Sequence, residues 1–205
     1  MKGPGSLQRL SSANGAFSMI ELLVVMAVCL ILFTMYWNHG PSKRDVQLAS
    51  CRQNLEKIYL ALQIYAHDNS DKYPVTTNAV TSEDPLALLV PHYTSDTLIF
   101  ICPASGDSPL PANKAFRDCK ISYAYYMGRH GSDEGQALMS DEQVNTLSKN
   151  IGDTVFSEKG RAPGNNHGKD GGNFLMCEGN VVSSTSNAPI SLTLSPSVVL
   201  LNPKP

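Results

Sequence analysis

A single acidic side chain, Glu21, lies in an otherwise uncharged apolar segment that runs from Phe17 to Trp37. A charged side chain costs about 2.5–3.5 kcal/mol at the centre of a bilayer on insertion scales, and less near an interface. Such a charge usually has a partner, because opposite charges attract far more strongly in a low-dielectric environment than in water. Glu21 therefore indicates either a helix that packs against another copy of itself or a carboxylate that reaches the headgroup level.

The cysteines are the next residues that could do chemistry. Cys29 lies inside the apolar segment and is expected to be a small buried hydrophobe. The other four allow three pairings: Cys51, Cys102, Cys119 and Cys177. If this part of the chain lies outside the cytoplasm, disulfides are permitted, and a Cys102–Cys119 bridge would close a short loop rich in Pro, Ser and Gly. No Cys-x-x-Cys or Cys-x-x-His spacing occurs, so we expect no metal site.

The histidines do not fall into a catalytic motif. No Gly-x-Ser-x-Gly or His-Glu-x-x-His sequence is present. His167, with Asp170 and Glu178 nearby in sequence, is the one constellation that could transfer a proton, and a structural hydrogen bond in the last hairpin is the simpler interpretation. We therefore predict no catalytic residue and no enzymatic activity.

Two polar loops offer oxygen ligands for calcium, at residues 68–71 (Asp-Asn-Ser-Asp) and 170–173 (Asp-Gly-Gly-Asn). Neither has the twelve-residue spacing of an EF-hand, so solvated turns are the default interpretation. No cofactor is expected, and calcium is the alternative. The glycine-rich residues 168–172 are not flanked by a strand and a helix as a phosphate-binding loop would be.

Composition limits the classes of protein that need to be considered. The formal net charge is −2 and no basic cluster is interleaved with aromatic residues, so nothing indicates nucleic-acid binding. A hydrophobic content of 42% with 17% charged residues is typical of a folded chain. Once the apolar segment and the residues before it are set aside, the remaining length suffices for one modest domain.

The elements that must position these residues begin with the apolar segment. A helix from Phe17 to Trp37 would be about 31 Å long, close to the ~30 Å hydrocarbon core of a bilayer. Its apolar character runs all round, which favours a membrane span over a buried core helix. Basic residues precede it as in a signal peptide, but the run is too long and residues 37–40 offer no small-x-small cleavage site. Because basic residues also follow it, the positive-inside rule does not favour a cytoplasmic amino terminus.

A second helix is predicted after the Gly40-Pro41 interruption. Apolar residues recur at three- and four-residue steps from Leu48 to Ala66, and a polar cluster at residues 67–71 ends the pattern. Beyond it, turn formers separate short candidate elements. The expected strands are 98–102, 121–127, 154–157, 173–177 and 181–183, and the expected helices are 85–91 and 140–150. The proline-containing tail, 183–205, either adds an edge strand at 190–194 or stays loose. This pattern is α+β.

The start of the apolar segment, Phe-Ser-Met-Ile-Glu-Leu-Leu at residues 17–23, follows a short basic leader and resembles the processing signal of type IV pilins and type II secretion pseudopilins. The resemblance implies that a prepilin peptidase removes residues 1–16 by cutting between Ala16 and Phe17. Phe17 would then be N-methylated, and Glu21, now the fifth residue, would pair with the amine of a neighbouring subunit. The family prefers Gly before the cut, and a cut after Gly15 would leave Glu21 sixth.

Later segments are similar to a bacterial pseudopilin-like branch, namely residues 51–74, 100–103, 121–125 and 167–181. Where that branch often has Asp-Gly-His, this chain has Glu-Gly-Asn at 178–180. The resemblance implies an assembly helix at 17–37, its amphipathic second half at 38–69, and an exported β-rich domain at 70–205 whose small antiparallel sheet packs on that helix. Some major pseudopilins bind calcium in a carboxy-terminal loop, which is the basis of the calcium alternative.

The function implied by the resemblance is that of a structural subunit of a pilus-like or pseudopilus filament. Its expected partners are the prepilin peptidase, other pilin or pseudopilin subunits and inner-membrane lipid, with no nucleic acid. The chain would cross the bacterial inner membrane once, with the carboxy-terminal domain in the periplasm or outside the cell. The alternative is a membrane-tethered exported domain that binds a ligand or polysaccharide without polymerising. Secretion, adhesion and DNA uptake are all compatible with the sequence.

Overall fold

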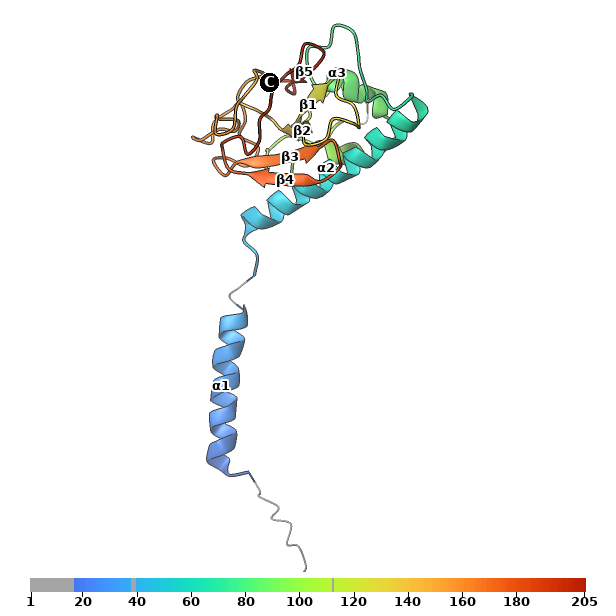
Figure 1. The fold of residues 1–205 in the computed structure, drawn as a ribbon. Coiled ribbons are helices and arrows are strands. Elements are labelled where there is room, and N and C mark those ends of the chain that lie inside the picture. The colour runs from blue at the N-terminus through green and yellow to red at the C-terminus, as the bar shows by residue number, and fades with distance from the viewer. Residues whose placement is uncertain (1–16, 38–39, 112) are drawn as a thin grey trace, which may run out of the picture. The chain divides into compact units, whose positions relative to one another are not determined.

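The computed structural model describes residues 17–37, 40–111 and 113–205 (Figure 1). Internal contacts divide the chain into two units, Met1–Pro41 and Ser42–Pro205, and each is described by itself.

The first unit contains helix α1, Met19–Trp37. Its first turn is closed by reciprocal hydrogen bonds: the Ser18 N–H donates to Glu21 Oε2 at 2.8 Å, and the Glu21 N–H donates to Ser18 Oγ at 3.2 Å. No residue of α1 is buried, so its apolar side chains are uncovered on every side. Within the described part of the chain, α1 is the one helix long and apolar enough to cross a membrane.

The second unit begins with helix α2, Lys43–Asp68. Ser42 and Asp45 form a capping box at its start, which satisfies backbone N–H groups of the first turn. The apolar residues predicted to share a face are buried together: Cys51, Leu55, Ile58, Ala61, Leu62 and Ala66. The opposite face carries the exposed Arg52–Glu56 ion pair, 3.2 Å apart at i,i+4 spacing.

Five antiparallel strands form one sheet in the order β4-β3-β2-β1-β5. The strands are β1 (Tyr123–Met127), β2 (Ala137–Asp141), β3 (Gly172–Met176), β4 (Val181–Ser184) and β5 (Val199–Leu201). Short helical segments precede them: α3 (Glu83–Leu86), η1 (Ala87–Leu89), η2 (Thr97–Phe100) and η3 (Phe116–Asp118). Together with the apolar helix of the first unit, this confirms the predicted α+β class.

The sheet has a hydrophobic core on each face. Side chains at alternate strand positions, such as Tyr123 and Tyr125, join the buried stripe of α2, which packs along β3 and β4 (Figure 1). Their neighbours Ala124 and Tyr126 point to the other face, where loop residues such as Phe156 complete a second cluster. The first core, between α2 and the sheet, positions the site described below.

Several predicted elements were wrong. Residues 98–102 contribute to the 3₁₀ helix η2 rather than a strand, and the helix expected at 140–150 is absent, because its first two residues end β2. The expected strand at 154–157 forms only an isolated bridge between Thr154 and Asn187. The tail is not loose: Glu83 Oε1 accepts the Lys204 N–H at 3.0 Å, and the tail's strand is β5 rather than 190–194.

Candidate functional site

The first candidate site is the start of α1. Phe17 and Glu21 are solvent-exposed in the isolated chain, and the Glu21 carboxylate contacts the backbone N–H of Ser18. Ala16, on the other side of the predicted cut, lies outside the described residues. The cut itself therefore stays a prediction.

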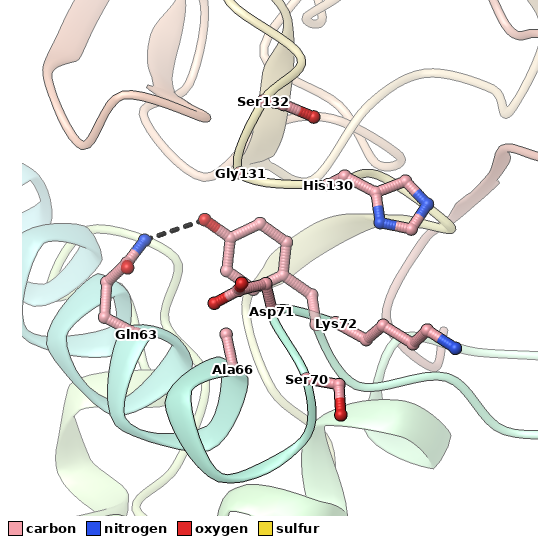
Figure 2. Close-up of a pocket in the computed structure, with 9 residues that line it drawn as sticks. Gln63, Ala66, Ser70, Asp71, Lys72, His130, Gly131 and Ser132 are labelled. Carbon is pink, nitrogen blue, oxygen red and sulfur yellow. Dashed lines mark hydrogen bonds between the residues drawn. The ribbon is translucent and has the colours of Figure 1, made fainter.

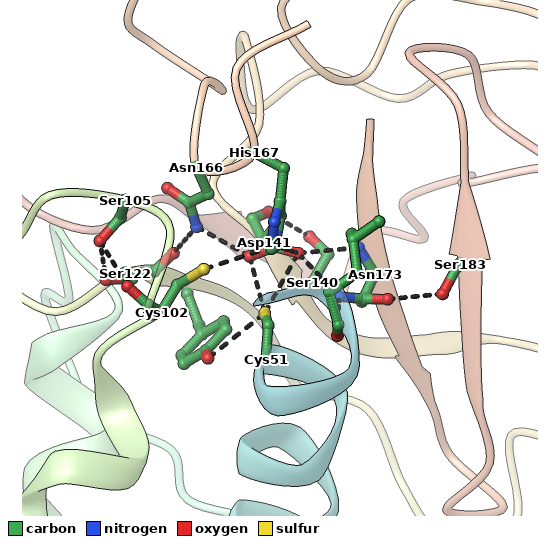
Figure 3. Close-up of polar contacts among 12 residues, drawn as sticks. Cys51, Cys102, Ser105, Ser122, Ser140, Asp141, Asn166, His167, Asn173 and Ser183 are labelled. Carbon is green, nitrogen blue, oxygen red and sulfur yellow. Dashed lines mark hydrogen bonds and ion pairs between the residues drawn. The ribbon is translucent and has the colours of Figure 1, made fainter. Parts of the chain in front are cut away.

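The second candidate site is a buried polar cluster between α2 and the sheet, formed by Cys51, Cys102, Asp141 and His167 (Figure 3). α2 supplies Cys51, the loop after η2 supplies Cys102, the end of β2 supplies Asp141, and the loop before β3 supplies His167. Each side chain offers one sulfur, nitrogen or oxygen atom, and these four atoms all lie within 4.8 Å of one another. The four residues are 0–7% exposed, so the cluster is closed to solvent.

The contacts within the cluster are short. Cys102 Sγ lies 3.4 Å from His167 Nε2, and the same nitrogen lies 3.3 Å from Asp141 Oδ2. The Cys51 thiol donates to Asp141 Oδ1 at 3.2 Å. A Cys-His-Asp catalytic triad uses both ring nitrogens of its histidine, one for the thiol and one for the carboxylate. Here Nε2 faces both groups and Cys102 is buried, so the cluster is not arranged as such a triad.

A second layer of donors surrounds Asp141 and Cys51 (Figure 3). The Asn166 side-chain amide donates to Asp141 Oδ1 at 2.8 Å, and the Asn173 backbone N–H donates to Oδ2 at 2.7 Å. The Tyr123 hydroxyl donates to Cys51 Sγ at 3.4 Å. These bonds fix the orientation of the carboxylate and of one sulfur.

The environment shifts the pKa values of all four groups. Burial raises the pKa of Cys51 well above its ordinary value. The hydrogen bond with Cys51 lowers the pKa of Cys102 to about 7, against the effect of burial. Burial lowers the pKa of His167, but the hydrogen bonds with Asp141 and Cys102 outweigh it and raise that pKa to about 10. Burial would raise the pKa of Asp141, yet His167, Asn166 and Asn173 together lower it.

Comparison with protein families finds a match over a stretch that includes the first site. Residues 11–37 match the prokaryotic N-terminal methylation motif, and this stretch includes α1. The chain fits a type IV pilin- or pseudopilin-like protein. No curated protein and no solved structure matched the chain. In pilin-like precursors this motif implies processing by a prepilin peptidase and assembly with pilin-like subunits, and the apolar helix is consistent with membrane anchoring.

The pilin-like chain does not contain the predicted Cys102–Cys119 bridge, since both are free cysteines in the structure. Cys102 lies in the buried cluster, whereas the Cys119 thiol donates to the Ala115 carbonyl at 3.4 Å. His167 pairs with Asp141 rather than with the side chains of Asp170 or Glu178. Sequence reasoning missed Cys51 and Asp141 as site residues because the four members of the cluster are far apart in sequence and share no short motif.

Of the two loops considered for calcium, residues 68–71 lie apart from the buried cluster, whereas Asn173 of residues 170–173 belongs to its second layer of donors. Asp170 forms an ion pair with Arg44 at 3.0 Å. Ser70 and Asp71 line a surface cavity of about 450 Å³ between the end of α2 and the loop after β1 (Figure 2). Lys72 and His130 line the same cavity, and all four residues are solvent-exposed. These exposed groups carry charges of both signs, and calcium binding stays a prediction.

Proposed function

We propose that this chain is a structural subunit of a pilus-like or type II secretion pseudopilus filament. A prepilin peptidase cuts it between Ala16 and Phe17, Phe17 is N-methylated, and the chain is held in the inner membrane before assembly. The observation that carries the proposal is that the methylation motif at 11–37 coincides with an apolar helix whose one charge is Glu21. The carboxy-terminal domain lies in the periplasm or outside the cell.

The exposure of α1 supports assembly. A helix that is apolar on all sides needs an apolar environment on all sides. Lipid supplies it before assembly, and the α1 helices of neighbouring subunits supply it in a filament. Glu21 is then the group that fixes the register, because a carboxylate left unpaired among apolar helices is strongly disfavoured. The ammonium freed at Phe17 of a neighbouring subunit is its partner.

The first prediction is that Glu21→Ala inserts into the membrane as wild type does but loses incorporation into filaments. Insertion depends on apolar length, which the substitution preserves, whereas incorporation requires the carboxylate as a partner for the ammonium. We expect at least about a tenfold loss from the sheared filament fraction, since one missing buried charge pair exceeds 1.4 kcal/mol. Immunoblots of membrane and filament fractions measure both quantities.

The matched control is Glu56→Ala, which removes one carboxylate from the exposed face of α2 and should leave incorporation unchanged. Normal incorporation of Glu21→Ala would contradict the proposal. If, in addition, ligand binding by the anchored protein were intact, the non-polymerising binding domain would be the better account. Intact mass and amino-terminal sequencing of the membrane-extracted chain test processing: sixteen residues lost and one methyl group gained are expected, and a chain that still begins at Met1 would overturn it.

A further inference from the structure

The buried cluster contains the donor set of a structural metal site: two thiols, an imidazole and a carboxylate. We propose that Cys51, Cys102, Asp141 and His167 together bind one Zn²⁺ ion in the interior of the carboxy-terminal domain. The site is independent of the filament role, because all four ligands belong to the unit Ser42–Pro205.

The spacing of the donor atoms fits tetrahedral zinc. With Zn–S bonds of about 2.3 Å and Zn–N and Zn–O bonds of about 2.0–2.2 Å, tetrahedral coordination places donor atoms about 3.3–3.8 Å apart. Cys102 Sγ and His167 Nε2 are 3.4 Å apart, and that nitrogen is 3.3 Å from Asp141 Oδ2. Cys51 Sγ lies 3.2 Å from one oxygen of Asp141 and 3.5 Å from the other. The remaining donor pairs lie within 4.8 Å, so shifts of up to about 1 Å would complete the geometry.

The orientation of His167 is that of a ligand. Its Nε2 is directed at Cys102 Sγ and Asp141 Oδ2 at once, and a single imidazole nitrogen cannot make two good linear hydrogen bonds with one proton. A cation between these three atoms satisfies all of them together. Cys51 Sγ lies within 4.8 Å of the other three donor atoms, so it is near enough to supply the fourth ligand.

Charge and the second layer agree with this assignment. Two thiolates and a carboxylate around Zn²⁺ leave one net negative charge, as in the common Cys₃His sites. Donors to the ligand atoms are already in place: Asn166 and the Asn173 N–H on Asp141, and the Tyr123 hydroxyl on Cys51. Such donors orient ligands and disperse the excess charge. Thiolate ligands disfavour calcium and magnesium, and a mixed set of sulfur, nitrogen and oxygen suits zinc.

The site is structural rather than catalytic. Four protein ligands fill a tetrahedral shell, and their burial leaves no open position for water or substrate. The ion would link α2, the loop after η2, the end of β2 and the loop before β3. These segments are distant in sequence, so the bound ion would lower the free energy of the folded domain relative to the unfolded chain.

The second prediction is that the full-length chain, purified in detergent from cells grown with zinc, contains about one zinc per chain. Cys102→Ser should reduce the zinc content at least fivefold, because it removes one thiolate from a four-ligand site. The matched control is Cys119→Ser, which removes a buried cysteine outside the cluster and should retain the zinc. Elemental analysis by mass spectrometry gives the ratio of metal to protein.

A second measurement does not depend on the folding of a variant. Wild-type chain stripped by a chelator and refilled with Zn²⁺ should regain the metal and show a higher Tm than the stripped form. Refilling with Co²⁺ should give intense tetrahedral d–d bands and a thiolate-to-cobalt charge-transfer band. The rival state is a Cys51–Cys102 disulfide, which an exported domain permits. A Cys51–Cys102 disulfide found by peptide mapping under non-reducing conditions, or a wild-type chain that takes up no zinc when reduced and refilled, would overturn the proposal.

Discussion

Glu21 lies at the start of an apolar helix and Asp141 in a buried polar cluster, and the partners of these two carboxylates differ. The Asp141 carboxylate is buried and contacts Cys51, Asn166 and His167 within its own domain. The Glu21 carboxylate accepts the Ser18 N–H, and the Glu21 N–H donates to the Ser18 hydroxyl. The other side chains of α1 are apolar apart from Thr34. Asp141 therefore contributes to the fold of its own domain, whereas the pairing of Glu21 with another subunit belongs to the proposed function.

The third prediction concerns Asn166, whose buried amide bridges two acceptors. Its Nδ2 donates to the Ser122 carbonyl at 2.6 Å and to Asp141 Oδ1 at 2.8 Å. Asn166→Ala leaves both acceptors without this donor, so we expect the free energy of unfolding to fall by about 2–3 kcal/mol. Urea unfolding followed by circular dichroism measures the change.

The control for Asn166 is the neighbouring Asn165, which is only partly buried and whose amide is 3.5 Å from the Gly160 carbonyl. Asn165→Ala should change the free energy of unfolding by less than about 0.5 kcal/mol. Equal losses for the two variants would contradict the role given to the second layer of donors around Asp141.

At the scale of elements, the β3–β4 hairpin depends on close backbone packing at Gly171, just before β3. Gly171 has a φ of +87°, and a Cβ at this position would lie 1.9 Å from the Ser184 carbonyl oxygen. Neither the left-handed backbone nor that contact tolerates a side chain, and the obstructing atom belongs to the backbone of β4, which cannot move without breaking the ladder.

The fourth prediction follows from this contact. Gly171→Ala should lower the free energy of unfolding by more than about 3 kcal/mol, because the strain of a positive φ and the clash act together. Gly135→Ala is the matched control: φ is +70° there, but no atom lies within 4 Å of the added Cβ, so only about 1 kcal/mol should be lost. Thermal or urea unfolding compares the two variants, and similar losses would show that the packing against Ser184 is unimportant.

The elements that the sequence predicted well are those with a clear period or turn. The 3–4 residue stripe of α2 and the Glu178-Gly179 turn between β3 and β4 are local signals. β2 was missed because Ser140 and Asp141 are typical of a helix start, whereas their place in the sheet depends on partners distant in sequence. Ser140 pairs with Ala124 and Phe174 on the neighbouring strands, and Asp141 accepts the Asn173 N–H. Three-residue β5 has no period of its own and is fixed by pairing with β1.

The two candidate sites also differ in whether their residues are neighbours in sequence. The predicted site at Phe17 and Glu21 is contiguous in sequence, and the methylation motif spans the same residues. The buried cluster brings together residues from four separate segments. Only the packing of α2 on the sheet brings Cys51 to Asp141, and the expectation of no metal site rested on short spacings that such a cluster does not need.

At the scale of the whole molecule, the chain consists of a unit without buried residues in its helix and a unit with two hydrophobic cores. Every residue of both cores lies after Ser42, and the capping box of Ser42 and Asp45 satisfies the start of α2 without any preceding residue. Among the described residues, the core and capping contacts of the second unit are thus all made by residues of that unit.

The fifth prediction is that a fragment of residues 42–205 folds cooperatively and is a monomer in water, because it retains both cores and lacks the apolar helix that requires lipid or other subunits. Circular dichroism during heating and sedimentation measure these two properties. A fragment that starts at Leu48 is the matched control: it loses the capping box and the Arg44–Asp170 ion pair but no core residue, so it should fold with about 1–2 kcal/mol less stability. An unfolded 42–205 fragment would contradict the division into two units, since the second would then need the apolar helix for its own structure.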